Sequence, residues 1–179
     1  MKKLIVLFSC VMVAMSCSNQ NAEPATATEP AASPKNVTLP YAASYSSSFE
    51  MGNPEYSATI LQGSWKDWET NHLENMKNWV ADTIIAMLSD NSTVKGVDSL
   101  MARWKRGRSE YTFVIDSISA VIPVYSTDRK ENWVLVWAYE INTKTNGIKD
   151  TMGVMETWRI NKDGKADLLL QYERANRKK

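Results

Sequence analysis

Residues 131–175 read ENWVLVWAYEINTKTNGIKDTMGVMETWRINKDGKADLLLQYERA, and this stretch decides the fold. Apolar and polar residues alternate through three segments, Trp133 to Asn142, Asp150 to Ile160 and Lys165 to Tyr172, with the period of two that is typical of β-strands. An Asn-Gly pair and an Asp-Gly pair separate the segments, and such pairs form tight hairpin turns. The stretch therefore predicts three consecutive antiparallel strands.

The two turns predict which side chains share a face of this sheet. Asn146-Gly147, taken as a two-residue loop, puts Trp137 opposite Glu156, and Asp163-Gly164, with a glycine bulge, puts Glu156 opposite Leu170. One face is then expected to hold Glu156 among large apolar side chains: Trp133, Leu135, Trp137, Tyr139, Val154, Trp158, Leu168, Leu170 and Tyr172. The other face is expected to hold Glu140 with Val134, Val136, Ala138, Met155, Thr157 and Leu169.

The residues before this stretch favour helices. Asn53-Pro54-Glu55 has the cap, the first-turn proline and the acid of a helix start, and an apolar stripe at helical spacing follows it. The further elements expected in chain order are a cap at Asn71 to Glu74 with a short helix, a strand from Thr83 to Leu88, a helix from Val97 to Trp104 closed by Lys105-Arg106-Gly107, and a strand from Tyr111 to Val124. Helices followed by antiparallel strands predict an α+β fold.

Three local motifs carry a resemblance to a known family. They are Trp79-Val80-Ala81-Asp82-Thr83, then Val94 to Asp98 followed by Trp104, and then Trp158 to Lys165 with its Asp-Gly turn. In this order they resemble the NTF2-like superfamily, in particular its SnoaL-like branch, from about Tyr56 to Arg174. The resemblance implies N-terminal helices packed on a strongly bent antiparallel sheet that forms a cone-shaped pocket, a cystatin-like architecture. The superfamily includes isomerases, cyclases, epoxide hydrolases and members without known activity, so the fold alone does not give the function.

The N-terminus indicates export. Met1-Lys2-Lys3 precedes an apolar run of about a dozen residues, which matches a secretory signal and is shorter than the roughly 20 residues of a membrane span. Ala14-Met15-Ser16-Cys17 resembles a bacterial lipobox, and that resemblance implies cleavage before Cys17 and a diacylglycerol on its thiol. Leu7-Phe8-Ser9-Cys10 is a rival box, and secretion without lipid is the alternative.

The predicted layout places the chain in the cell envelope. A signal peptide (1–16) precedes the lipidated cysteine and a flexible linker rich in Ala, Pro, Ser and Thr (17–48), an NTF2-like domain (49–175) and a basic tail (176–179). The bilayer is the expected partner of the acylated Cys17, and the outer membrane facing the periplasm is the expected location.

Composition removes several classes of site. Cys10 and Cys17 are the two cysteines, so after cleavage and lipidation no thiol remains for catalysis or for a metal, and His72 is the one histidine. We expect no metal and no cofactor. The chain has 21 basic residues, and cleavage of the signal peptide would remove two of them, Lys2 and Lys3. The remaining 19 basic residues are balanced by 20 acidic ones, and this balance gives no case for nucleic-acid binding.

The predicted pocket suggests two functions. Its expected lining is Trp137, Tyr139, Glu156, Trp158, Leu170 and Tyr172. Glu156 is the candidate for chemistry because an acid among apolar side chains has a raised pKa, although it can equally contact a ligand or shape the core. One hypothesis is a non-catalytic module that binds a small apolar ligand or a protein, with a homodimer formed through the other sheet face. The alternative is an enzyme of the SnoaL/isomerase type that works by general acid-base chemistry through Glu156 on a hydrophobic substrate.

Overall fold

Seven strands form one sheet in the computed structural model, which describes residues 40–175. The sheet order is β1-β4-β5-β6-β7-β2-β3. The strands are β1 (Phe49–Met51), β2 (Val80–Met87), β3 (Thr93–Lys95), β4 (Tyr111–Ser126), β5 (Glu131–Lys144), β6 (Lys149–Ile160) and β7 (Ala166–Ala175). The predicted signal peptide, Cys17, most of the linker and the tail lie outside the described residues.

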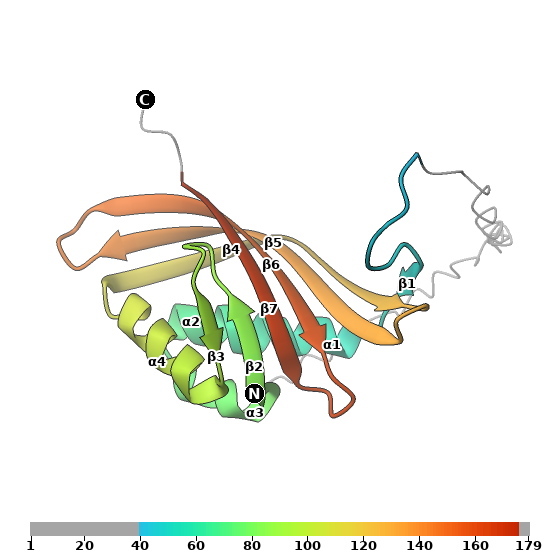
Figure 1. Cartoon of the computed structure of the whole chain (residues 1–179). Helices are drawn as coiled ribbons and strands as arrows, with labels where there is room; N and C mark the ends of the chain where they lie inside the picture. Colours follow the sequence, from blue (N-terminus) through green and yellow to red (C-terminus); the bar gives the residue numbers. More distant parts are fainter. Residues whose placement is uncertain (1–39, 176–179) are drawn as a thin grey trace, which may run out of the picture. The chain divides into compact units, whose positions relative to one another are not determined.

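Helices cover one face of this bent sheet, which confirms the predicted α+β architecture (Figure 1). They are α1 (Pro54–Ile60), η1 (Leu61–Lys66), α2 (Asp67–Thr70), η2 (Leu73–Asn75), α3 (Met76–Trp79) and α4 (Val97–Arg108). The antiparallel run β4-β5-β6-β7 was predicted, but β7 also pairs in parallel with β2. The edge strands β1 and β3 have three residues each and leave too little alternation to be predicted.

The first helical run is continuous from Pro54 to Thr70. Asn53 caps it as predicted, since its side chain accepts a hydrogen bond from the Glu55 N–H at 3.0 Å. Its middle, η1, is a π-helix, a wider turn that is frequent at functional sites. The predicted cap at Asn71 to Glu74 is wrong: Asn71 ends α2 in the left-handed conformation, and η2 begins without a side-chain cap.

Helix α4 runs through Gly107 instead of ending there. The guanidinium of Arg108 explains the extra turn, because it donates to the carbonyl oxygens of Trp68 at 2.8 Å, Glu69 at 3.1 Å and Tyr111 at 2.8 Å. These bonds attach the last turn of α4 to the end of α2 and to the first residue of β4.

The predicted face assignment is wrong, because two one-residue shifts occur. The Asn146-Gly147 turn has three residues instead of two, because the Lys144 N–H donates to the Ile148 carbonyl oxygen at 2.8 Å. As a result Val136, and not Trp137, lies opposite Glu156. The other turn pairs Asn161 with Lys165 as predicted, but a bulge around Asp167 puts Gln171 opposite Glu156. A shift of one residue turns every side chain of a strand to the other face.

The inner face, which the helices cover, therefore differs from the predicted one. It carries Val134, Val136, Ala138, Glu140, Asn142, Val154, Glu156, Trp158, Ile160, Leu169 and Gln171. The outer face carries Leu135, Trp137, Tyr139, Met155, Thr157, Leu168, Leu170 and Tyr172. Six residues were predicted to share the outer face with Glu140: Val134, Val136, Ala138, Met155, Thr157 and Leu169. Only Met155 and Thr157 lie on that face. Glu140 itself is on the inner face.

Trp158 lies at the centre of the core and is fully buried. Its ring packs edge-on against Trp79 at 5.2 Å and Trp104 at 6.2 Å between centroids. Gly63 in η1 allows this packing, since a Cβ at that position would lie 2.3 Å from the Trp79 Nε1.

The segment before β1 is docked on the sheet. Tyr45 donates to the carboxylate of Glu131 and packs edge-on against Trp133, and the guanidinium of Arg129 lies 4.5 Å from its ring centroid. The packed part of the chain thus includes residues before the expected boundary at 49.

Candidate ligand pocket

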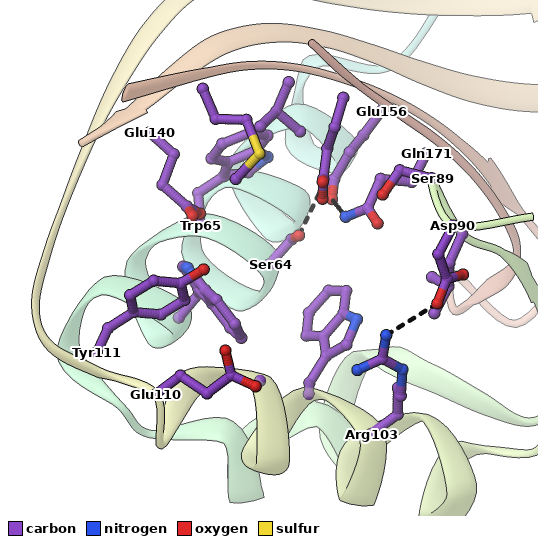
Figure 2. A pocket seen from close by; sticks show the side chains of 17 residues that line it. Ser64, Trp65, Ser89, Asp90, Arg103, Glu110, Tyr111, Glu140, Glu156 and Gln171 are labelled. Carbon is purple, nitrogen blue, oxygen red and sulfur yellow. Dashed lines mark hydrogen bonds and ion pairs between the residues drawn. The ribbon is translucent and has the colours of Figure 1, made fainter. Parts of the chain in front are cut away.

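A cavity of about 290 Å³ lies between the inner face of the sheet and the helices (Figure 2). Its wall combines aromatic rings from η1, α2 and α4 with carboxylates from three strands. The lining residues used below are Ser64, Trp65, Trp68, Asp90, Arg103, Trp104, Glu110, Tyr111, Glu140, Glu156, Gln171 and Glu173. Gly107 also lines it, and its missing side chain leaves room beside Trp68. The volume lies at the small end of ligand sites in proteins.

Glu156 is held in this wall by three donors. Its Oε2 accepts hydrogen bonds from the Ser64 hydroxyl at 3.0 Å and from the Trp158 Nε1–H at 2.9 Å. Its Oε1 accepts from the Gln171 amide at 3.1 Å (Figure 2). The donors come from η1, β6 and β7, so the position of the carboxyl group depends on both layers of the fold.

Burial makes Glu156 hard to ionise. The residue is 3% exposed, and this desolvation raises the pKa of its carboxyl to about 7, against the lowering effect of the three donors. A carboxyl with such a pKa exists in both protonation states near neutral pH.

Two further acids lie on the same face. Glu140 on β5 is buried, accepts from the Asn142 amide at 2.6 Å, and has a pKa raised mainly by desolvation. Asp116 on β4 lies opposite Glu140 in the sheet, and neither of its carboxyl oxygens has a hydrogen-bond partner among residues 40–175. Desolvation and the charge of Glu140 raise the pKa of Asp116 to about 8.

The rim of the cavity holds an ion pair and more carboxylates. Arg103 on α4 pairs with Asp90 in the β2–β3 turn at 3.0 Å, as Figure 2 shows. Glu110 and Tyr111, where α4 meets β4, lie on the opposite side of the cavity in that view. Glu173 on β7 completes this acidic rim.

The structure separates the residues that were predicted to line one pocket. Glu156 lines the cavity, and Trp158 lies behind it in the core. Trp137, Tyr139 and Tyr172 line a shallow hollow of about 460 Å³ on the outer face instead. Leu170 lies on the outer face near β2, beside a third hollow. The physical reason is the pair of register shifts described above.

Sequence reasoning missed most of the partners of Glu156. Gln171, and the neighbouring acid Glu140 on the same face, follow from strand alternation once the register is correct, so the signal was present but was assigned to the wrong face. Ser64 had no signal, because a helical wheel does not anticipate the π-helical turn that directs it to Glu156. His72 takes no part in the pocket; it is exposed and its Nδ1 lies 2.9 Å from the Thr70 hydroxyl.

The described part of the chain holds neither a metal-binding cluster nor a membrane-spanning helix. Within residues 40–175 no three metal-binding side chains lie close enough together to hold an ion. No helix among these residues is both long and apolar enough to span a bilayer.

Known structures share this fold. No family model and no curated protein matches the sequence. An NTF2-like protein of unknown function from Exiguobacterium aligns over 64% of this chain and 98% of its own, with TM-score 0.55 and 13% identity. A Δ5-3-ketosteroid isomerase from Mycobacterium aligns over 68% and 98%, with TM-score 0.53 and 16% identity. An epoxide hydrolase-like protein of M. tuberculosis aligns over 67% and 84%, with TM-score 0.53 and 11% identity. The chain thus has an NTF2-like fold, one that carries different activities in different proteins.

Proposed function

We propose that this chain is a lipid-anchored, periplasm-facing binding module whose SnoaL-like NTF2 domain takes up a small molecule without transforming it. The cavity supports a small molecule rather than a protein partner, because it lies between the two layers of the fold and not on a flat surface. The rings of Trp65, Trp68 and Trp104 offer an apolar wall for the body of such a ligand.

The observation that carries the proposal is the unfinished hydrogen bonding of Glu156. A carboxylate has about four acceptor positions, and three donors reach Glu156 among the described residues. Among the described residues its Oε1 accepts one hydrogen bond, from the Gln171 amide, which leaves one acceptor position while the carboxyl is ionised. One hydrogen bond from a ligand would complete the set.

An enzyme is the second candidate, and one observation favours it. The pKa of Glu156, raised to about 7 by desolvation, suits a general acid or base at neutral pH. Such an enzyme would belong to the SnoaL/isomerase type and would move a proton on a hydrophobic substrate.

A fragment screen by ligand-observed NMR on the purified full chain tests the binding proposal. Gly107→Leu should fill the cavity, whereas Gly107→Ala adds a Cβ only 3.6 Å from Trp68 Cη2, an ordinary contact, and serves as the matched control. We expect fragments that bind the parent and Gly107→Ala and that lose binding in Gly107→Leu, with no new compound formed on incubation.

Fragments that bind all three proteins equally would show that the cavity is not the site. A compound that the parent converts and that Glu156→Gln leaves unchanged would establish the enzyme instead.

A further inference from the structure

We infer that the ligand of this pocket carries a positive charge, as in a protonated or quaternary amino alcohol. The inference rests on the proposed function, since it assigns the chemistry of the molecule bound in the same cavity. It follows from the charges around the cavity and from the aromatic rings in its wall.

Carboxylates outnumber basic groups in two shells around the cavity. Glu140 and Glu156 line the inner wall, Asp116 lies opposite Glu140 on the neighbouring strand, and the charge of Arg108 acts on Glu140 and Asp116. Asp90, Glu110 and Glu173 lie on the rim with Arg103. Among the described residues the inner group has three acids with Arg108 and Lys66 beside them, and the rim has three acids with Arg103, so acids are in excess in both.

The basic groups near these acids already have partners, and Lys66 pairs with Glu69 at 3.1 Å. Arg103 pairs with Asp90 at 3.0 Å, and Arg108 donates to three backbone carbonyl oxygens. An anionic ligand would meet the carboxylates without a basic group free to bind it, whereas a cation would compensate the excess of acids.

The aromatic wall suits the same ligand. Trp65, Trp68, Trp104 and Tyr111 line the cavity, and aromatic faces attract organic cations that carry little hydration. Trp65 is 5% exposed, so a cation against its ring would be largely shielded from water. The hydroxyl of an amino alcohol would donate to Glu156 Oε1, which accepts one hydrogen bond among the described residues, so an amino alcohol fits better than a bare ammonium ion.

Binding of a cation should be linked to proton release. A positive charge beside Glu156, Glu140 and Asp116 favours their ionised forms, so the ligand lowers pKa values that burial raises. The charged and titratable groups that face these acids are Arg103 and Arg108 of α4, Lys66 and Glu69 of η1 and α2, Glu110, Tyr111, Glu173 and the Asp90 turn. Affinity should therefore increase as the pH rises through about 7.

Calorimetric titration of the full chain with three probes of similar shape tests the inference. The probes are choline, its uncharged analogue in which a tert-butyl group replaces the trimethylammonium group, and the anion pivalate. We expect choline to bind at least about tenfold more tightly than the uncharged analogue and pivalate not to bind. Choline should bind several-fold more tightly at pH 8 than at pH 6, and it should release protons.

Substitutions in the cavity test whether choline binds there. Glu140→Gln and Glu156→Gln should each weaken choline binding, with circular dichroism to confirm that they are folded, and Gly107→Leu should abolish it. Glu50→Gln removes an exposed carboxylate on β1 and should leave choline binding unchanged.

Two outcomes would contradict a positively charged ligand, and a third would contradict the proposed function. Tighter binding of the uncharged analogue or of pivalate, lost in Gly107→Leu, would overturn the positive charge and leave the small-molecule proposal intact. Failure of choline to bind, while other fragments still depend on Gly107, would overturn it as well. The absence of any Gly107-dependent ligand would instead overturn the proposed function itself.

Discussion

At the scale of single residues, Glu156 joins the two layers of the domain. Its carboxyl connects η1, β6 and β7 through Ser64, Trp158 and Gln171. Buried polar groups of this kind are stable only when they are hydrogen-bonded, and these three bonds partly offset the cost of desolvation. The remaining cost appears as the raised pKa.

Glu156→Gln should change how stability depends on pH. In the folded protein the pKa is about 7 against an ordinary 4.5, so the folded state holds the proton more tightly than the unfolded state. The contribution of Glu156 to the free energy of unfolding of the parent should therefore be largest below a pH of about 4.5. It should be lost as the pH rises to about 7. The Gln variant, which cannot ionise, should match the parent near pH 4 and exceed it by on the order of 2 kcal/mol at pH 8.

Urea unfolding of both proteins at the two pH values measures this difference. Glu50→Gln, on the edge strand β1, is the matched control and should follow the parent at both pH values. A Gln variant that is less stable than the parent at pH 8, with equal stability at pH 4, would mean that Glu156 is stabilised as an anion in the fold.

At the scale of the elements, the sequence predicted most strands but not their faces. The strands β4 to β7, the first helix with its Asn53 cap and α4 were all expected, because hydrophobic periodicity and turn residues are local signals. The faces depended on one extra residue in the Gly147 turn and on one bulge near Asp167. Neither is encoded by alternation, and each moves a whole strand by one position.

The candidate site was predicted in its centre but not in its surroundings. Glu156 was identified because it was the one acid among the apolar residues of its predicted face. Strand β6 does alternate in this way, and Glu156 lies on its buried face. Its expected neighbours Trp137 and Tyr172 belong to β5 and β7, the two strands that shifted. Asp116 could not be placed at all, since the register of β4 depends on contacts with β5 that no turn signal fixes.

The π-helical turn η1 gives a prediction at this scale. Gly63→Ala places a Cβ 2.3 Å from Nε1 and 2.4 Å from Cε2 of Trp79, whose ring cannot move because it packs on Trp158. We expect a loss of about 2 kcal/mol in the free energy of unfolding, the usual cost of overpacking a core. Urea unfolding should show it.

Gly107→Ala is the comparison for that change. Its Cβ meets only Trp68 at 3.6 Å, and alanine is a better helix former than glycine by about 1 kcal/mol. This variant should be as stable as the parent or more so. Equal stability of the two alanine variants would show that η1 can move away from Trp79.

At the scale of the whole molecule, the outer sheet face leaves several large apolar side chains uncovered. It exposes Phe113, Ile115, Ile122, Tyr139, Ile141 and Tyr172. The corrected register makes this face more aromatic than the sequence suggested. Contiguous apolar surface of this kind usually marks an interface.

We expect a homodimer formed through this face. Tyr139→Glu places a charge in its middle and should give a monomer in sedimentation velocity at tens of micromolar, where stable dimers of standard interface size persist. Ala102→Glu introduces the same charge at an exposed residue of α4, in the helix layer on the other side of the sheet, and should remain dimeric. A parent protein that sediments as a monomer under these conditions would contradict the prediction.

Attachment to the membrane is the second prediction at this scale. If a diacylglycerol on Cys17 holds the chain, Cys17→Ser should move it from the membrane fraction to the soluble fraction, because one modification supplies two acyl chains. The measurement is fractionation followed by a high-salt wash. Cys10→Ser is the control and should stay with the membrane; the reverse pattern would assign the lipid to Cys10.

The parallel contact between β2 and β7 also determines the order in which the domain can assemble. Val80 lies opposite Ala166 and Ile85 opposite Leu168. The first long strand of the chain, β2, therefore cannot complete its pairing until the last strand, β7, is present. Pairings between such distant residues slow folding, because the loop must close before the contact stabilises it. During synthesis, β2 therefore has β3 as a neighbour but lacks β7 until the final strand has been made. The domain therefore stays incompletely folded through most of its translation, and if the predicted signal peptide directs export, this is the state in which the chain could pass a narrow channel.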